Sequence, residues 1–185
     1  MMSTSPHRVR AGRALLALLA LLAVSGCTAC GATASVPEGF TVMETTGAAV
    51  GAPPGWTVRI DEPDRLLVVG QAVSGDAVEA FDLKIGNFSG DFDAAVLGIT
   101  DPFRFGTVED YQLLDERDAT VAGADTARLA DGTYLDDSSE RTRQWDVFAT
   151  VDGATQLVYL SLKAPESVFD EDVMAQILQS LEVRL

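Results

Sequence analysis

Short runs of alternating apolar and polar residues recur between Phe40 and Leu185, and they restrict the fold more than any other pattern in the chain. In residues 79–88, Phe81, Leu83 and Ile85 alternate with polar residues and a glycine. A period of two is typical of a strand with one buried face. Comparable runs, separated by turn residues, predict strands at residues 40–44, 56–60, 65–73, 79–88, 111–121, 124–134, 142–151, 156–163 and 181–185.

Two segments carry a helical pattern instead. Residues 92–99 place their apolar side chains on one helical face, and Asp91 is a suitable N-cap. Residues 170–180 also form an apolar stripe, with Asp170, Glu171 and Asp172 at the start of the helix, where acids suit the helix dipole. These patterns predict an α+β domain with an antiparallel β-sheet covered by helices; an all-β domain is the alternative.

The N-terminal segment predicts export. Its first thirteen residues contain three arginines and no acid, and residues 14–24 are apolar throughout. A basic segment followed by a short apolar one is typical of a signal peptide, since a membrane-spanning helix needs roughly 20 residues. The next residues, Val24-Ser25-Gly26-Cys27, resemble a bacterial lipobox. We therefore expect cleavage before Cys27 and a lipid on that cysteine; a buried or disulfide-bonded cysteine is the alternative.

Three parts of the chain follow from this cleavage site. Residues 1–26 are predicted to be a lipoprotein signal peptide, and residues 27–39 the lipidated cysteine and a flexible tether rich in small residues. Residues 40–185 are long enough for one globular domain with its own core. Cys30 then has no cysteine partner in the chain, so the domain depends on its core rather than on an internal disulfide. The expected location is the cell membrane, lipid-anchored on its extracytoplasmic face.

The mature chain is strongly acidic. The full sequence has 28 acidic and 13 basic residues, and three arginines leave with the signal peptide, so the mature net charge is −18. Such a surface repels nucleic acid and anionic lipid headgroups. We expect no nucleic-acid partner, and a partner that is an envelope protein or small molecule. Abundant arginine and alanine beside only two lysines are typical of GC-rich genomes, such as those of actinobacteria.

The sequence offers little catalytic machinery. The single histidine, His7, lies in the signal peptide, which excludes Ser-His-Asp triads, Cys-His pairs and histidine-ligated metal sites from the mature protein. No glycine-rich phosphate loop is present. We predict no catalytic, cofactor-binding or metal-binding residues, and a protein that is not an enzyme.

Two sets of acids and two tryptophans remain as candidate site residues. The acids are Asp91 with Asp93, and Asp136 and Asp137 with Glu140; calcium ligands or a hydrolytic carboxylate pair are the functional interpretations. Neither set has EF-hand spacing, so a helix cap and a solvated loop are favoured. Trp56 and Trp145 could form an aromatic ligand platform, but their positions in predicted strands favour core or rim packing.

Several short motifs point to a known family. They are Pro54-Gly55-Trp56, Val121-Ala122-Gly123-Ala124, Asp152-Gly153 leading to Leu157-Val158-Tyr159-Leu160, Ala164-Pro165, and Ser180-Leu181-Glu182-Val183. Their order resembles that in the actinobacterial LpqN-type lipoproteins, whose domain is related to the PsbP-like fold. This resemblance implies a PsbP-like α/β/α sandwich and a non-enzymatic binding or assembly role.

The sequence therefore predicts a membrane-anchored cell-envelope lipoprotein that acts as a non-catalytic binding or assembly module. One alternative is a carrier of lipid or another envelope molecule, which would need a large apolar cavity. Another is a hydrolase of envelope glycans, which would need two carboxyl groups about 5 to 5.5 Å apart if it retained configuration.

Overall fold

A computed structural model describes residues 33–74 and 77–185. The predicted signal peptide, Cys27 and Cys30 lie outside these residues. Within the described part of the chain, no helix is both long and apolar enough to cross a membrane.

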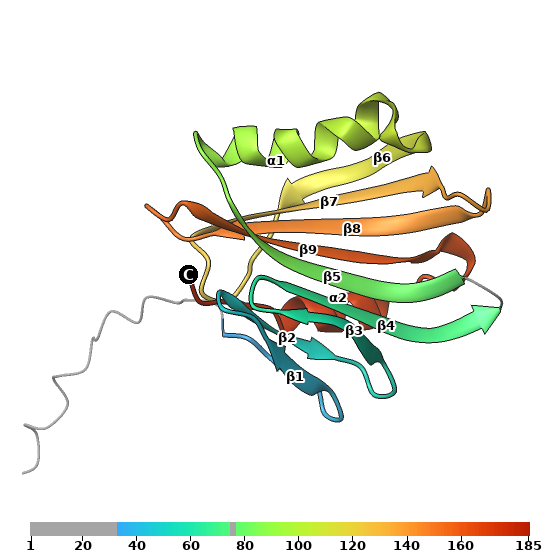
Figure 1. The fold of residues 1–185 in the computed structure, drawn as a ribbon, viewed down its shortest axis with the longest axis horizontal. Coiled ribbons are helices and arrows are strands. Elements are labelled where there is room, and N and C mark those ends of the chain that lie inside the picture. Colours follow the sequence, from blue (N-terminus) through green and yellow to red (C-terminus); the bar gives the residue numbers. More distant parts are fainter. Residues whose placement is uncertain (1–32, 75–76) are drawn as a thin grey trace, which may run out of the picture. The chain divides into compact units, whose positions relative to one another are not determined.

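The main sheet of the described chain has seven antiparallel strands in the order β3-β4-β5-β9-β8-β7-β6 (Figure 1). The strands are β3 (Thr57–Glu62), β4 (Arg65–Ser74), β5 (Ala77–Asn87), β6 (Glu109–Asp118), β7 (Thr126–Leu135), β8 (Arg141–Thr150) and β9 (Gln156–Pro165). Asp152-Gly153 joins β8 to β9, and Gly153 has a φ of +77°, so the hairpin predicted there is confirmed.

A second sheet contains β1 (Thr41–Glu44), β2 (Ala48–Ala52) and β10 (Glu182–Val183), in the order β1-β2-β10. The sequence did not predict β2, because its residues Ala-Ala-Val-Gly-Ala are small and apolar without alternation. All five are buried, which explains the missing polar positions. Ser180 supports this strand, since its hydroxyl accepts a hydrogen bond from Gly51 N at 2.8 Å.

Two helices lie on opposite faces of the main sheet. Helix α1 (Phe92–Pro102) is longer than predicted and continues into an irregular helical turn, η1 (Phe103–Thr107). Helix α2 (Glu171–Gln179) follows a short 3-10 turn, η2 (Glu166–Val168). Asp170 caps α2 by accepting hydrogen bonds from Asp172 N and Val173 N. The α+β prediction is confirmed, and the all-β alternative is wrong.

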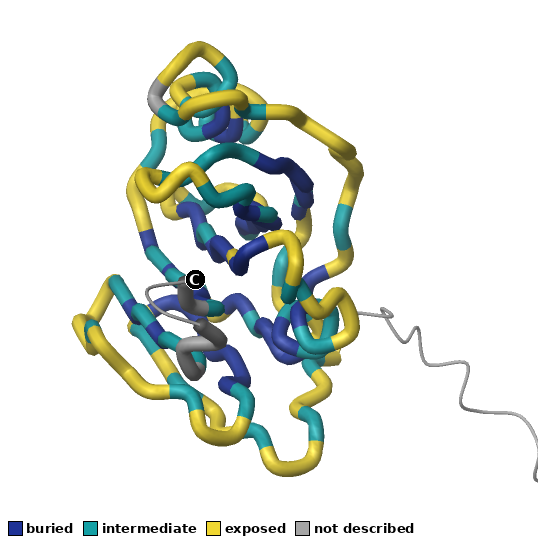
Figure 2. Tube along the Cα trace, turned by 90° about the vertical axis from the view of Figure 1, so that its right-hand side faces the viewer, coloured by how far each residue is buried: buried dark blue, intermediate teal, exposed yellow. Residues whose placement is uncertain are grey.

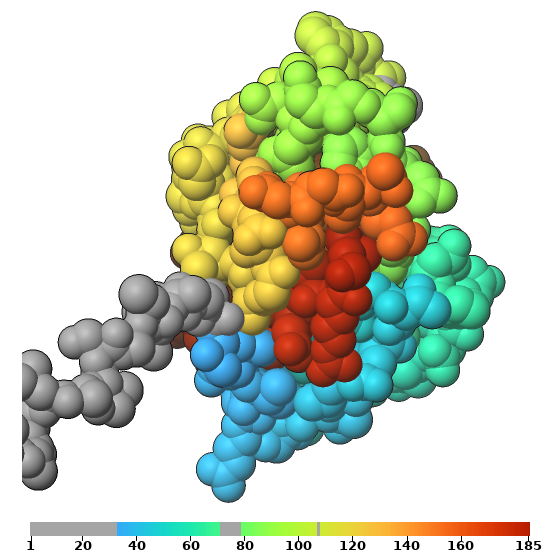
Figure 3. All heavy atoms as spheres, turned by 90° about the vertical axis from the view of Figure 1, so that its left-hand side faces the viewer, coloured from blue at the N-terminus to red at the C-terminus, as the bar shows by residue number. Residues whose placement is uncertain are grey.

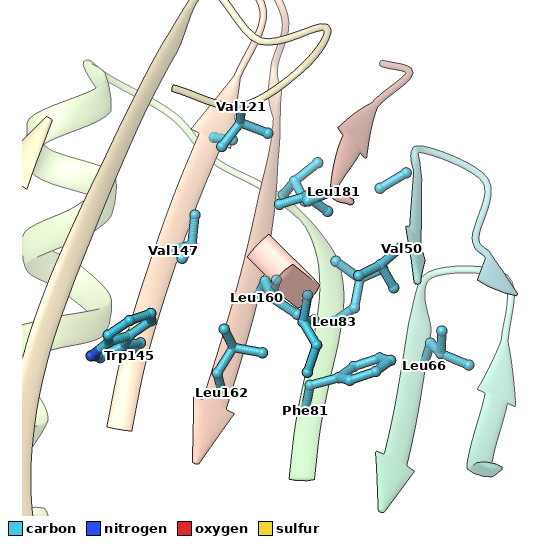
Figure 4. Packing of buried hydrophobic residues seen from close by; sticks show 14 of the residues in the cluster. Val50, Leu66, Phe81, Leu83, Val121, Trp145, Val147, Leu160, Leu162 and Leu181 are labelled. Atoms are coloured by element: carbon cyan, nitrogen blue, oxygen red, sulfur yellow. The ribbon is translucent and has the colours of Figure 1, made fainter. Parts of the chain in front are cut away.

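The larger core lies between the main sheet and the layer formed by α2 and the second sheet (Figure 4). Phe81, Leu83 and Leu160 project from central strands and are fully buried. Met174 and Ile177 reach the same core from α2, and Val50 reaches it from β2. Burying one such side chain contributes about 1.5 to 3 kcal/mol, so this layer supplies much of the stability.

A smaller core lies beneath α1. Val96 packs with Phe148 and Leu157, which come from β8 and β9. Because side chains alternate along a strand, Val147 and Phe148 enter different cores. Figure 2 shows how buried residues concentrate in the inner strands while the outer turns are exposed.

The two ends of the described chain meet at one end of the domain. Ser35 N donates a hydrogen bond to the carbonyl of Gln179, and Ala122 forms a parallel bridge with Glu182. Gly123 has a φ of +75°, and a Cβ there would lie 2.1 Å from the carbonyl oxygen of Val183. Only glycine allows this approach. Figure 3 shows the N-terminal strands, the C-terminal segment and the β8–β9 turn gathered on this face.

Candidate functional site

The acids proposed as calcium ligands have structural partners. Asp91 accepts a hydrogen bond from Ala94 N at 2.7 Å and caps α1, while Asp93 pairs with Arg128 at 2.8 Å. Asp136 accepts hydrogen bonds from Ser138 N, Ser138 Oγ and Glu140 N, which close the β7–β8 turn and lower the pKa of its carboxyl. The helix-cap interpretation of Asp91 and the loop interpretation of residues 136–140 are confirmed. Within the described residues, no three potential metal ligands lie together.

Both tryptophans pack against the larger core. Trp56 stacks on Phe81 with ring centroids 6.0 Å apart and covers Gly70, where a Cβ would lie 2.9 Å from the indole. Trp145 is only 6% exposed and meets Phe169 edge to face at 5.5 Å. The core interpretation is therefore confirmed. Figure 4 shows the Trp145 nitrogen directed away from the other labelled side chains, and this buried nitrogen has no hydrogen-bond partner in the described chain.

A buried carboxyl group lies at the centre of the sheet face that carries α1. Asp146 is 5% exposed, and its neighbours in the sheet place Ser161 and Gln144 beside it. Gln144 Nε2 donates to both carboxyl oxygens, at 2.7 and 2.9 Å, and the Tyr159 hydroxyl donates to Oδ1 at 2.8 Å. We call Asp146, Gln144, Tyr159 and Ser161 the Asp146 cluster. Burial raises the pKa of Asp146, although the hydrogen bonds oppose this shift.

The three tyrosines of the chain are all influenced by Asp146. Burial and the nearby carboxyl raise the pKa of Tyr159, which donates to it directly. Burial also raises the pKa of Tyr134 to about 12, and that of Tyr111, with Asp146 contributing to both shifts. Tyr111 lies over Gly132, where a Cβ would meet its hydroxyl at 2.8 Å.

The shifted pKa values limit what this cluster can do chemically. A phenol with a raised pKa is a weaker source of nucleophilic oxygen, and a carboxyl with a raised pKa is less available as an anion. Both oxygens of Asp146 already accept hydrogen bonds from its neighbours. This arrangement fits a satisfied polar interior that fixes strand and side-chain positions.

Most cationic side chains of the domain are used in ion pairs. The described chain contains ten lysines and arginines, and eight of them have an acidic partner within 4.0 Å. Arg59 and Lys163 are the two without one in that part of the chain. Both side chains are exposed. The unpaired charge on the surface is therefore overwhelmingly acidic.

One ion-pair network joins α1 and η1 to the outer strands of the sheet. Glu116 on β6 pairs with Arg104 at 2.6 Å and with Arg128 of β7 at 3.5 Å, and Arg128 also pairs with Asp93.

A second ion-pair network lies on the opposite face of the sheet. There Arg143 pairs with Asp131 at 2.7 Å and Glu171 at 2.6 Å and lies over the Phe169 ring. The hydrogen bonds that Arg143 donates to Asp131 are the largest influence that raises the pKa of Arg143.

Strand β6 and the turn before it carry the two most exposed large apolar side chains of the described residues. β6 is an edge strand of the described sheet, and nine of its ten residues are exposed. Leu114 is 51% exposed, and Phe105 in η1 is 84% exposed. We call Glu109–Asp118 together with Phe105 the β6 edge surface. An open depression of about 350 Å³ at one end is lined by Glu116, Arg117, Asp118 and Arg128.

The sequence predicted neither the Asp146 cluster nor the β6 edge surface. Asp146 lies between the apolar residues Trp145 and Val147, so alternation predicts that its side chain lies on a polar face of the strand. Alternation does not predict that α1 and neighbouring strands bury this side chain. The strand itself was predicted at 111–121, and its many acids are typical of an edge. Strand order is set by contacts distant in sequence, so the edge position could not be predicted locally.

No family model and no curated protein sequence matches this chain. Its fold is nevertheless similar to solved structures. LpqN of Mycobacterium tuberculosis aligns with a TM-score of 0.56 and 18% identity, covering 75% of this chain and 83% of LpqN. The Saccharomyces cerevisiae Ran-binding protein Mog1p aligns with a TM-score of 0.54 and 10% identity, covering 78% of this chain and 95% of Mog1p. PsbP of the cyanobacterium Synechocystis aligns with a TM-score of 0.51 and 11% identity, covering 88% of this chain and 98% of PsbP. The described domain therefore has a fold like that of LpqN, Mog1p and PsbP.

Proposed function

We propose that this protein is a membrane-anchored cell-envelope lipoprotein whose domain acts as a non-catalytic binding module. The observation that carries the proposal is the contrast between the buried Asp146 cluster and the exposed strand β6. The polar groups of the Asp146 cluster are satisfied from within the domain. Its long outer strand β6 instead exposes apolar side chains and a free edge. Such surfaces favour association with another molecule over catalysis.

Two fold neighbours are consistent with this proposal. LpqN is described as involved in cell envelope biogenesis, and Mog1p as a Ran-binding protein. A location on the extracytoplasmic face of the membrane rests on the sequence, because the lipobox-like Val24-Ser25-Gly26-Cys27 follows a basic and apolar leader. The lipid would hold the domain at the membrane, while the tether gives it reach.

The anchor is tested by intact-mass measurement of the protein extracted from membranes of the producing cells. We expect a chain that begins at Cys27 and carries a diacylglyceryl group. Cys27→Ala should abolish that added mass, whereas Cys30→Ala, the matched control three residues away, should retain it. Cleavage at another residue, or an unlipidated mass in the native protein, would overturn the membrane-anchored part of the proposal.

The binding role is tested by placing a photo-crosslinking residue at exposed positions on different elements, such as Val42, Val58 and Leu114. We expect a discrete adduct with an envelope protein or molecule from at least one position in living cells, identified by mass spectrometry. If every position yields only uncrosslinked protein while the chain is folded and lipidated, the binding role is wrong.

A further inference from the structure

Strand β6 presents a long, unpaired backbone edge. It is ten residues long, and no other strand of the described chain lies beyond it. At about 3.3 Å per residue its ends lie about 30 Å apart. An unpaired edge offers a row of N–H and C=O groups that an extended peptide can pair with.

The charges along β6 are arranged unevenly. The three acids in the interior of the strand all form ion pairs. Asp110 pairs with Arg141, Asp115 with Arg117, and Glu116 with Arg104 and Arg128. The side chains of Glu109 and Asp118, at the two ends of the strand, form no ion pair or hydrogen bond within the described residues. Two uncompensated carboxylates therefore flank an edge whose middle is close to neutral.

Apolar side chains lie between and beside these acids. β6 has two register shifts against β7, one between Glu109 and Gln112 and one between Leu113 and Asp115. The second places Leu113 and Leu114 against one residue of β7, which is the pattern of a β-bulge. Leu113 remains 40% exposed and Leu114 51% exposed. Phe105, before the first residue of β6, is 84% exposed. These residues could pack against apolar side chains of a partner.

From these features we infer that the β6 edge surface binds an extended polypeptide segment of eight to ten residues, with apolar residues in its middle and a basic residue near each end. The segment adds a strand to the sheet through backbone hydrogen bonds, and its two basic residues meet Glu109 and Asp118. This inference rests on the proposed binding function and specifies the chemistry of the partner.

A second copy of this chain is a poorer occupant. Full-length antiparallel pairing of β6 with itself would place Glu109 of one copy opposite Asp118 of the other at both ends of the pair. Asp110 would lie opposite Arg117, but both already have ion-pair partners within their own copy. Like charges directly opposite each other on adjacent strands are destabilising. A basic segment replaces both repulsions with attractions.

The other edge strand of the sheet, β3, lacks this arrangement. It has six residues and carries Arg59 beside Asp61 and Glu62, none of which has an ion pair in the described chain. A partner on β3 would meet both signs of charge within four residues. β3 is therefore a suitable control edge on the same molecule.

The direct test measures binding of a labelled ten-residue synthetic peptide to the mature chain purified from the producing cells. The peptide has lysine at each end and alternating valine and threonine between, with blocked termini. Fluorescence anisotropy gives the affinity, and hydrogen exchange with mass spectrometry gives the location. We expect binding with protection of residues 109–118 and no change over residues 57–62. Protection elsewhere, or no binding at low ionic strength, would overturn the inference.

Two matched double variants separate a specific edge from general acidity. Glu109→Lys with Asp118→Lys changes the β6 edge, and Asp61→Lys with Glu62→Lys makes the same charge change on β3. All four side chains are exposed, so both variants should fold. We expect the β6 variant to weaken peptide binding about tenfold or more, and the β3 variant by less than about twofold. Equal loss in both would mean that only net charge attracts the peptide, and the inference would fail.

Failure here is distinguishable from failure of the proposed function. If the peptide does not bind β6 but cellular crosslinks form elsewhere on the domain, the binding role stands and the acids of β6 serve only to prevent edge pairing. If crosslinks form nowhere, the binding role itself is wrong.

Discussion

The Asp146 cluster predicts a measurable coupling between two buried side chains. Asp146→Ala removes the acceptor used by the Tyr159 hydroxyl and by Gln144 Nε2. A buried donor left without a partner costs about 1 to 3 kcal/mol, so two such donors together cost about 2 to 6 kcal/mol. Removing a buried carboxyl with a raised pKa gives back part of this loss. We therefore expect a net destabilisation of about 2 to 4 kcal/mol.

Tyr159→Phe removes the donor instead and should cost about 1 to 2 kcal/mol, because Asp146 keeps its bonds to Gln144. In the double variant no tyrosine hydroxyl is left unsatisfied. The combined loss should therefore be smaller than the sum of the single losses, by about 1 to 2 kcal/mol.

Urea unfolding at neutral pH, followed by tryptophan fluorescence, measures the four free energies in this cycle. Asp170→Ala with Tyr159→Phe is the control pair, because Asp170 caps α2 on the opposite face and shares no partner with Tyr159. That pair should be additive within about 0.5 kcal/mol. Additivity in the Asp146–Tyr159 cycle as well would refute the coupling, and with it the view that this hydrogen bond organises the polar interior.

Further predictions concern pH, packing, capping and the exposed tip. Burial raises the pKa of Asp146, so the folded wild-type protein holds the carboxyl proton more tightly than the unfolded chain does. Asp146→Asn removes this titrating group. The free energy of unfolding of the wild type should therefore fall relative to that of the variant as pH rises above about 4. Urea titrations from pH 4 to 8 check this, and a constant difference would contradict it. Gly132→Ala should displace Tyr111 and cost about 1 to 3 kcal/mol in thermal melts, whereas Gly86→Ala, with open space at its Cβ, should cost less than about 1 kcal/mol. Asp91→Ala removes the cap of α1 and should lower the free energy of unfolding by about 1 kcal/mol, measured by urea unfolding. Phe105→Ser should change stability by less than about 0.5 kcal/mol at any protein concentration; a concentration-dependent loss would mean that Phe105 is buried between copies.

Local patterns in the sequence predicted most elements of this fold because their causes are local. Alternation identified β5 and β8 since each has one face in the larger core. Asp170 and the apolar stripe after it identified α2 to within a residue or two. Asp91 identified the start of α1, although the sequence ended that helix at residue 99 and the structure continues it to Pro102.

What local patterns could not predict depends on contacts between distant segments. β2 has no alternation because both of its faces are covered, and only its pairing with β1 and β10 makes it a strand. The burial of Asp146 depends on β9 supplying Tyr159 and Ser161. The exposure of Leu114 depends on β6 being the last strand in the order, which no residue of β6 determines by itself.

The charge of the domain acts on a basic partner at two ranges. The excess of acidic over basic residues, 28 against 13 in the full sequence, attracts any cationic segment from a distance and mainly raises its association rate. At physiological ionic strength charges are screened over about 8 Å, so this attraction does not select one strand edge over another. Contacts at the ends of β6 act at short range and should mainly slow dissociation. Reversing Glu109 and Asp118 should therefore raise the dissociation rate of the peptide, whereas reversing Asp61 and Glu62 should lower only its association rate. Rates that change alike in both variants would show that binding does not depend on the β6 edge.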